Sequence, residues 1–213
     1  MSDIEPKTDE CMMYLVRHGA TKGNLATPAI LQGRDVDHGL CDYGRQQAEK
    51  TAKLLADRKL FAAFSSPLKR ARETAETIAK LHEIKVCAIE DLMEADVGKW
   101  SGRSWNDIAR EEPDAYERFR NDPGNYGYRG GETMKEVLNR VKPTIERIMS
   151  ENLGRNILVV AHSVVNRTFI GNALGLSFSQ GRAVSQSNCA LNVVRYRDGK
   201  FAVRTVNSVF HLL

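Results

Sequence analysis

The sequence predicts an α/β fold, a three-layer sandwich in which a mainly parallel sheet carries helices on both faces and an antiparallel strand lies at its edge. Short apolar runs of strand length alternate with amphipathic stretches of helix length, which is typical of parallel strands joined by crossover helices. Runs that are apolar throughout indicate strands buried on both faces. Asp198-Gly199, between two strand-like runs, predicts a tight hairpin and hence the antiparallel edge.

The first half of the chain contains the clearest strand and helix. Cys11–Val16 is a short apolar run, so it predicts a buried strand. Small and apolar residues recur at helical spacing over 42–59, which predicts a helix with Asp42 as its cap. The other elements expected up to residue 104 are a strand at 61–64, a helix from Ser66-Pro67 to about residue 83, a strand at 85–89 and an irregular stretch at 90–104.

The second half repeats the strand, loop and helix order. Apolar residues at near-helical intervals predict a long helix over 132–151, in which Pro143 is a candidate for a kink. The β-branched run 156–161 predicts a strand, followed by a helix from near Val165. The remaining expectations are short helical pieces in a cap segment around 103–130 and hairpin strands at 189–196 and 201–206.

Size and composition indicate one ordinary globular domain spanning residues 1–213. The net charge of +4 favours small anionic ligands but lacks the dense Lys/Arg runs of a nucleic-acid-binding protein, and no membrane partner is expected. Met1–Glu10 is polar and does not resemble a secretory signal. The four cysteines lack zinc-site or disulfide spacing, which favours a reducing, cytoplasmic setting. Whether the chain forms a homo-oligomer is left open.

Residues able to carry chemistry cluster where strands are expected to end. Arg17-His18 follows the first strand, Arg70 stands in the first turn after the second, and His162 follows the run 156–161. Ligands of such sheets bind beyond the carboxyl ends of the strands. Arginine at a helix amino terminus conflicts with the helix dipole unless an anion is bound there. Glu94 lies in a loop rich in Gly and Trp, which indicates a specific conformation.

Each of these residues also has a purely structural interpretation. A histidine at a strand end is often satisfied by backbone hydrogen bonds, and Arg70 could belong to a solvated helix face. Glu94 could merely solubilise its loop. The arginines and tyrosines of the cap segment, Arg110, Arg118, Arg120, Tyr116, Tyr126 and Tyr128, could cover the site and bind an acidic substrate group or form a solvated surface.

Taken together, the order of these motifs resembles the histidine phosphatase superfamily, the phosphoglycerate-mutase-like enzymes, nearly from end to end. Residues 17–24 resemble the opening signature of that family. The other matching segments are the loop Gln32-Gly33-Arg34; Leu40, Gly44, Gln47 and Ala48; Leu68, Arg70, Ala71, Thr74 and Ala75; Glu94, Gly98, Trp100 and Gly102; Gly130-Gly131-Glu132-Thr133; and His162 to Arg167. Several motifs in the right order are far more specific than one Arg-His-Gly triplet.

The resemblance implies a metal-independent phosphohydrolase without a cofactor, of the histidine acid phosphatase type, acting on a small phosphorylated metabolite. It implies that His18 attacks phosphorus, that Glu94 protonates the leaving oxygen, and that Arg17, Arg70 and His162 hold the phosphoryl oxygens. It further implies that the residues around this centre contact the substrate or position the loop beside it, namely Asn24, Thr21, Gln32, Gly33 and Ser163. For Gly131 and Glu132 a tight turn is nearly as good an interpretation as substrate contact.

Some positions depart from the family pattern, and they bear on which reaction is catalysed. Ala20 replaces a common acidic residue, Gly39 a frequent proline, and Ser163 the glycine that often follows the second histidine. The segment before Gly130 and the carboxyl-terminal tail are both short, which favours a phosphatase over a mutase because water then reaches phosphohistidine. The alternatives are a cofactor-dependent phosphoglycerate mutase and an inactive phosphate-binding or scaffold protein.

Overall fold

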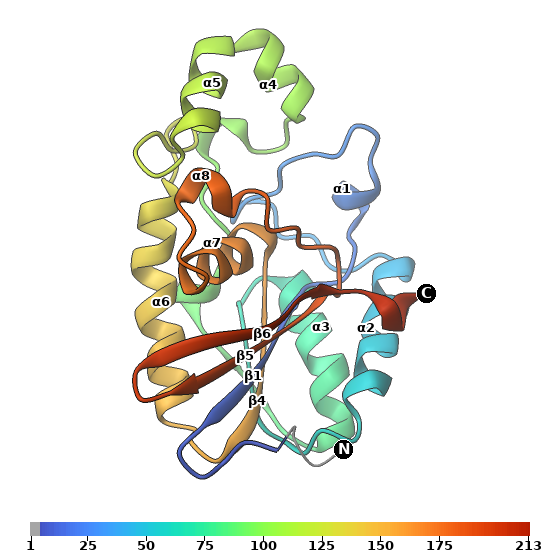
Figure 1. Ribbon diagram of the computed structural model, residues 1–213. Coiled ribbons are helices and arrows are strands. Elements are labelled where there is room, and N and C mark those ends of the chain that lie inside the picture. Colours follow the sequence, from blue (N-terminus) through green and yellow to red (C-terminus); the bar gives the residue numbers. More distant parts are fainter. Residues whose placement is uncertain (1–4) are drawn as a thin grey trace.

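Six strands form one mixed sheet in the computed structural model, which describes residues 5–213 (Figure 1). The strands lie in the order β3-β2-β4-β1-β5-β6. Strands β1 to β4 are parallel, β5 is antiparallel to β1, and β6 is antiparallel to β5. Their bounds are β1 Cys11–Arg17, β2 Leu60–Ser65, β3 Val86–Ala88, β4 Arg155–Ala161, β5 Leu191–Arg197 and β6 Lys200–Ser208. The predicted mainly parallel sheet with an antiparallel edge is confirmed.

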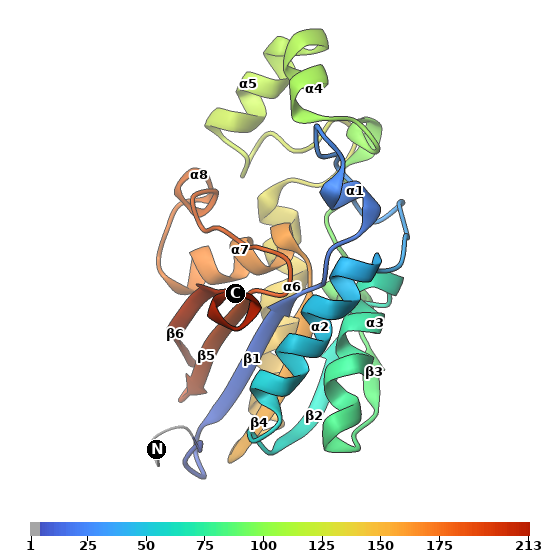
Figure 2. The same cartoon turned by 90° about the vertical axis from the view of Figure 1, so that its right-hand side faces the viewer.

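Helices cover both faces of this sheet, and Figure 2 shows α2 and α3 gathered on one side of the strands. Alternate residues of β1 supply the two cores. Met12, Tyr14 and Val16 pack with α2 and α3, whereas Met13 and Leu15 pack with α6 and α7. This two-sided burial explains why the run is apolar throughout. The four helices are α2 Asp42–Leu55, α3 Lys69–Ala79, α6 Met134–Ser150 and α7 Ser163–Ala173.

Short helices stand beyond the carboxyl ends of the parallel strands, at the top of Figure 1. Helix α4 (Trp105–Glu111) and helix α5 (Pro113–Asn121) form the segment expected to be a cap. Phe119 and Tyr128 join it to the main core, with ring centroids 4.7 Å apart. The remaining short helices are α1 Lys22–Leu25, α8 Phe178–Gly181, and the 3₁₀ turns η1 Lys80–His82, η2 Glu90–Leu92, η3 Gly98–Trp100 and η4 Phe210–Leu212.

Several predicted helix boundaries were wrong, each for a local reason. Helix α2 is preceded by Cys41 as its cap, not Asp42, and it ends at Leu55 because the chain turns back through Lys59 at a positive φ of 43°. Helix α3 begins at Lys69, since Leu68 is still extended with a ψ of 134°. Helix α7 begins at Ser163 rather than near Val165.

The long helix and the hairpin follow the sequence closely. Thr133 caps α6 and exchanges hydrogen bonds with Glu136 in a capping box. The helix is not interrupted at Pro143. Asp198 and Gly199 both have positive φ, as the predicted tight turn requires. The polar leader predicted over 1–10 lies partly outside the described residues. Among the described residues, no helix combines the length and apolar character needed to cross a membrane.

Candidate active site

Two histidines meet because β1 and β4 are neighbours in register. Arg17 pairs with Ala161, so His18 and His162 are the next residues of two parallel strands. The backbone N–H of His18 donates to the carbonyl of Ala161 at 3.0 Å. The two imidazole ring centroids lie 5.1 Å apart. Strand pairing alone therefore brings together two histidines that are 144 residues apart in the chain.

The His18 ring is held in one tautomer. Its Nδ1 lies 2.7 Å from the carbonyl oxygen of Gly19, which can only accept a hydrogen bond, so Nδ1 carries the proton and Nε2 the lone pair. Burial lowers the pKa of His18 well below its usual 6.5, and the positive charges of Arg17 and Arg70 lower it further. The ring is therefore neutral at ordinary pH.

His162 lies deeper than His18 and caps α7. It is fully buried, and neither ring nitrogen has a hydrogen-bond partner in residues 5–213. Burial also lowers its pKa well below 6.5, with contributions from Arg70 and His18. A buried polar group without a partner is costly, so this ring is ready to bond an oxygen supplied by a ligand.

Arg70 is a buried cation and Arg17 a partly buried one, and both are fixed by backbone carbonyls. Arg17 donates through Nη1 to the carbonyl of Gln186 at 2.5 Å, and burial lowers its pKa to about 10. Arg70 donates to the carbonyls of Val36 and Gly33 at 2.6 and 2.7 Å. The Nε atoms of both arginines are buried without a partner in the described chain. These bonds orient the two guanidinium groups and leave donors available to an anion.

Glu94 meets the amino terminus of α7. Its carboxylate accepts hydrogen bonds from the backbone N–H groups of Val164 and Val165 at 3.2 and 3.4 Å, and from its neighbour Ala95 at 3.0 Å. This end of a helix favours negative charge. Glu94 is nearly buried, and it is the one carboxylate among the pocket-lining residues of the described chain.

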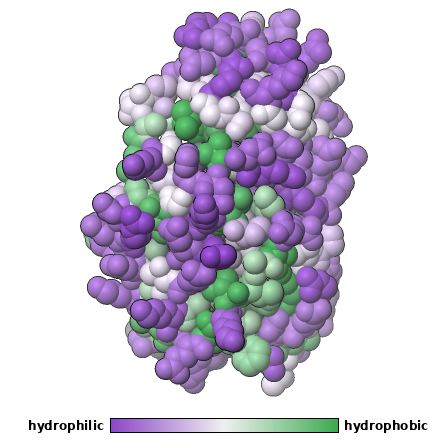
Figure 3. Space-filling view, turned by 180° about the vertical axis from the view of Figure 1, so that it is seen from behind, coloured by the Kyte–Doolittle hydropathy of each residue, from purple (hydrophilic) through white to green (hydrophobic). Residues whose placement is uncertain are grey.

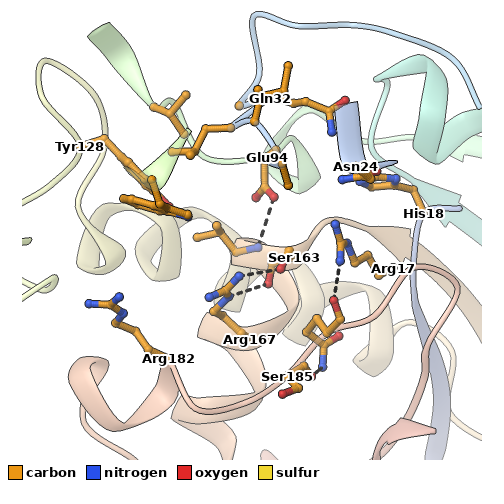
Figure 4. Close-up of a pocket in the computed structure, with 18 of the residues that line it drawn as sticks. Arg17, His18, Asn24, Gln32, Glu94, Tyr128, Ser163, Arg167, Arg182 and Ser185 are labelled. Carbon is orange, nitrogen blue, oxygen red and sulfur yellow. Dashed lines mark hydrogen bonds between the residues drawn. The ribbon is translucent and has the colours of Figure 1, made fainter. Parts of the chain in front are cut away.

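Arg17, His18, Arg70 and Glu94 line a pocket of about 590 Å³ between the strand ends and the cap, which Figure 4 shows in close-up. One wall comes from the strand ends and the loops beside them, and the opposite wall from the cap and the region of α7 and α8. The first wall contains Arg17, His18, Asn24, Gln32, Gly33, Arg70 and Glu94, and the second contains Trp105, Phe119, Tyr128, Ser163, Arg167 and Arg182.

Most predicted site residues line this pocket, but Thr21 and His162 do not, and His162 lies behind the lining with its ring 5.1 Å from that of His18. Thr21 is fully buried, caps α1 and donates to the side chain of Gln32 at 2.8 Å. Direct substrate contact by Thr21 is therefore not supported, and it positions the loop instead. Asn24 accepts through Oδ1 from Thr21 and Asn188, and its amide Nδ2, which has no partner among residues 5–213, can donate into the pocket.

Two other predicted segments serve packing. Gly19 approaches Gly44 of α2 so closely that a Cβ on either residue would overlap the backbone near the other. Glu132 pairs with Arg34 at 2.6 Å and Arg140 at 2.8 Å and does not line the pocket, so its turn is structural. In residues 5–213, no three His, Cys, Asp or Glu side chains are grouped so as to hold a metal ion.

Comparison with known protein families identifies the family of this chain. The family model described as histidine phosphatase superfamily (branch 1) matches residues 13–209. The chain belongs to the histidine phosphatase superfamily. The resemblance seen in the sequence motifs is thereby confirmed, and so is the phosphoglycerate-mutase-like fold class.

Similar members of the superfamily include named phosphatases. A metal-independent phosphoserine phosphatase of Arabidopsis thaliana is 33% identical over 219 residues, covering 99% of this chain and 87% of that protein. Phosphoserine phosphatase 1 of Hydrogenobacter thermophilus is 28% identical over 200 residues, covering 94% and 93% of the two chains. The prediction of a phosphatase is supported, and the mutase alternative has no better support.

Solved structures show the same architecture. Bacillus stearothermophilus YhfR superimposes with a TM-score of 0.87 at 28% identity, covering 95% of this chain and all of that one. Phosphoserine phosphatase from Entamoeba histolytica, solved in complex with 3-phosphoglyceric acid, gives a TM-score of 0.85 at 25% identity, with 95% and 100% coverage.

In this histidine phosphatase, two arginines of the pocket had no role assigned from the sequence, although one of them, Arg167, ends the matched motif His162 to Arg167. Arg167 lies one helical turn after Ser163 in α7, so helical spacing from a predicted site residue could have found it. Arg182 follows α8 in a segment without a recognisable motif, and only the fold brings it to the pocket. The predicted cap arginines Arg110, Arg118 and Arg120 are exposed and do not line this pocket.

Proposed function

We propose that the protein hydrolyses phosphate monoesters of small metabolites through a phosphohistidine formed on His18. The observation that carries the proposal is the pair of neutral histidines beside two arginines, Arg17 and Arg70, that form no ion pair in residues 5–213. A phosphoryl group placed there would be bonded by Arg17, Arg70 and His162 and would satisfy their unpaired donors.

The first step transfers the phosphoryl group to the protein. The lone pair on Nε2 of His18 attacks phosphorus, and the bond between phosphorus and the ester oxygen breaks. Glu94 in its protonated form gives its proton to that oxygen, so that the alcohol leaves neutral. The arginines stabilise the charge that spreads over the equatorial oxygens in the transition state, a role that cations without a metal can fill.

The second step releases phosphate. The Glu94 carboxylate removes a proton from a water molecule, and that water attacks phosphorus on the phosphohistidine. The bond between phosphorus and nitrogen breaks, its electron pair returns to Nε2, and inorganic phosphate leaves. Glu94 is protonated again and ready for the next ester. The hydrogen bond from Nδ1 to Gly19 keeps the imidazole in the same tautomer throughout.

The proposal includes the role of the cap, the substrate contacts and the cellular compartment. Residues 103–130 would act as a cap over the pocket of one domain, and Asn24, Gln32, Gly33 and Ser163 would contact the substrate. Phosphoserine is a candidate because two relatives are named for it. Four unpaired cysteines are compatible with a reducing cytoplasm. Neither a nucleic-acid partner nor a particular oligomeric state is part of the proposal.

The test is a phosphatase assay with p-nitrophenyl phosphate and a panel of metabolite esters, run beside His18→Ala. We expect steady phosphate release by the wild type, an acid-labile phosphoprotein in quenched samples, and a loss of turnover of roughly 10⁴-fold or more in the variant. Replacing His82, which lies outside the pocket, with Ala is the matched control and should keep full activity.

Three results would contradict the proposal. One is undiminished hydrolysis by His18→Ala, which excludes this residue as the nucleophile. Another is phosphoglycerate interconversion that depends on a bisphosphorylated primer and exceeds hydrolysis, which would identify a mutase. The third is the absence of phosphate release from every ester by a folded wild type, which would identify a phosphate-binding protein without catalysis.

A further inference from the structure

The pocket contains more positive charge than a phosphoryl group needs. Four arginines line it, Arg17, Arg70, Arg167 and Arg182, and none of them forms an ion pair with any carboxylate of residues 5–213. Glu94 is the one acid among the lining residues of that range. A phosphate monoester dianion balances two of the four cations, and Glu94 carries no charge while it holds the proton that it donates. Positive charge is left over, which favours a further negative charge on the substrate.

Arg167 is held on the wall opposite His18. Its Nε donates to the backbone carbonyl of Ser163 at 3.2 Å and its Nη2 donates to the hydroxyl of Ser163 at 2.6 Å (Figure 4). Both bonds come from the side of the guanidinium group that faces α7. The structure records no partner for Nη1 within the described chain, so this edge of the fork is available to a ligand.

Arg182 approaches the same space from beyond α8. Its Nη1 donates to the carbonyl of Arg120 at 3.0 Å, and its guanidinium carbon lies 5.4 Å from the centroid of the Phe119 ring. Figure 4 shows Arg167 and Arg182 side by side below Tyr128, and Arg17 and His18 across the pocket. Burial and the neighbouring cations Arg120 and Arg167 lower the pKa of Arg182. An anion between the two guanidinium groups would relieve this repulsion.

We propose that Arg167 and Arg182 form a subsite for a carboxylate on the alcohol part of the substrate. The inference rests on the proposed function, because the phosphoryl group must be held by Arg17 and Arg70 for the second anion to face this wall. The substrate class is then phosphate monoesters of small hydroxy acids or hydroxy amino acids. Two neighbouring guanidinium groups can each donate to one oxygen of a carboxylate, and the bisphosphate comparison below distinguishes this anion from a second phosphate.

The first test uses the wild type and a matched pair of esters. 3-Phosphoglycerate and glycerol 3-phosphate differ chiefly in the carboxylate, as do phosphoserine and phosphoethanolamine. We expect kcat/KM to be about 10- to 100-fold higher for the acidic member of each pair, the range that a charge-assisted hydrogen-bond pair supplies. Fructose 1,6-bisphosphate against fructose 6-phosphate shows whether a second phosphate is accepted in place of the carboxylate.

The second test removes the proposed contact. Arg182→Gln should abolish most of the preference for the acidic ester, mainly by raising its KM, and Arg182→Lys should restore part of it. Arg118→Gln is the control, because this exposed arginine of α5 makes the same charge change outside the pocket. Its preference should equal that of the wild type. The thermal unfolding temperature of each variant shows whether a loss of preference comes from the missing contact or from an unfolded protein.

Several results of these two tests would overturn the subsite. Equal kcat/KM for both members of each pair in the wild type overturns the subsite, as does an Arg182→Gln variant that folds and keeps the preference. A preference for the bisphosphate without one for the acids overturns the assignment of a carboxylate. If Arg182→Gln does not fold, the wild-type comparison still decides. Failure of the proposed function is distinct, since the wild type would then release no phosphate from p-nitrophenyl phosphate.

Discussion

The arginines of the strand-end site and those of the cap have different hydrogen-bond partners. In the cap, Arg103 pairs with Glu111 at 2.7 Å and with Glu112, and Arg129 pairs with Glu112 at 2.5 Å. Hydrogen bonds from Arg129 and Arg103 lower the pKa of Glu112 to about 2. At the strand ends, by contrast, Arg70 is buried and Arg17 partly buried, and backbone carbonyls rather than carboxylates hold them.

The contrast separates charges that maintain structure from charges that await a ligand. The cap cations lie near the surface, which is hydrophilic at that end of the molecule in Figure 3, and their partners are part of the chain. Pairs of this kind contribute little to stability and need no further ligand. A buried cation without a carboxylate is costly, so its presence indicates an anion that arrives from outside.

The comparison is tested most strongly at Glu94, the single acid on the unpaired side of the pocket. If Glu94 is the proton donor, Glu94→Gln should lower kcat/KM, which reports phosphoryl transfer to His18 and not the later hydrolysis, by roughly 100- to 10,000-fold for an alkyl phosphate such as phosphoserine. The loss should be much smaller for p-nitrophenyl phosphate, whose leaving group needs no proton. Steady-state kinetics on both esters measure the difference.

The matched control is Glu112→Gln, which removes an acid from the ion-paired cap. It should change kcat/KM on either ester by less than about twofold, because Glu112 does not line the pocket. An equal loss on both esters in Glu94→Gln would contradict the role of proton donor. It would indicate instead that the carboxylate only fixes the amino terminus of α7.

A smaller effect is expected at Arg70. Arg70→Gln keeps a donor side chain but removes the charge, and we expect kcat to fall by roughly 100- to 1,000-fold, as when one transition-state donor is lost. Arg72→Gln makes the same change two residues later, on an exposed residue that pairs with Glu76. It should retain activity. Similar losses in the two variants would mean that general charge attraction, and not a fixed contact, explains the role of Arg70.

The strand-end side of the pocket was predictable from the sequence because regular structure builds it. A buried strand and the residue that follows it are local features of the sequence. His18 and His162 could therefore be placed at the same edge of the sheet before the fold was known. The same holds for Arg70, although its helix starts at Lys69 rather than Ser66. Pairing of β1 with β4 then brings these residues together.

The cap side could not be predicted in the same way. Trp105, Phe119 and Tyr128 reach the pocket through ring packing between two short helices and a loop, and no sequence periodicity encodes such contacts. Of the two interpretations left open for Arg110, the structure favours the solvated surface, because Asp107 and Glu111 lie within one helical turn and pair with it. Arg182 comes from a loop whose position depends on the whole fold.

Acid should destabilise the folded protein through the strand-end histidines. Their pKa values are lowered by burial, so below pH 6.5 the unfolded chain binds protons that the folded chain does not, and stability falls as the pH decreases. Each histidine contributes up to about 1.4 kcal/mol per pH unit, a tenfold change in the unfolding equilibrium. Above pH 6.5 the histidines should no longer lower the free energy of unfolding. Urea unfolding at pH 7, 6 and 5 measures it.

The double variant His18→Gln/His162→Gln shows which residues cause this dependence. Burial also lowers the pKa of His82 and His211, so some loss of stability in acid will remain in that variant. The slope of the unfolding free energy against pH measures how many more protons the unfolded state binds than the folded state. We expect this number to be lower than in the wild type by up to two. An unchanged slope would mean that the two imidazoles titrate in the folded protein as solvated groups do. They would then be protonated in weak acid, and the contrast with the solvated charges of the cap would not hold.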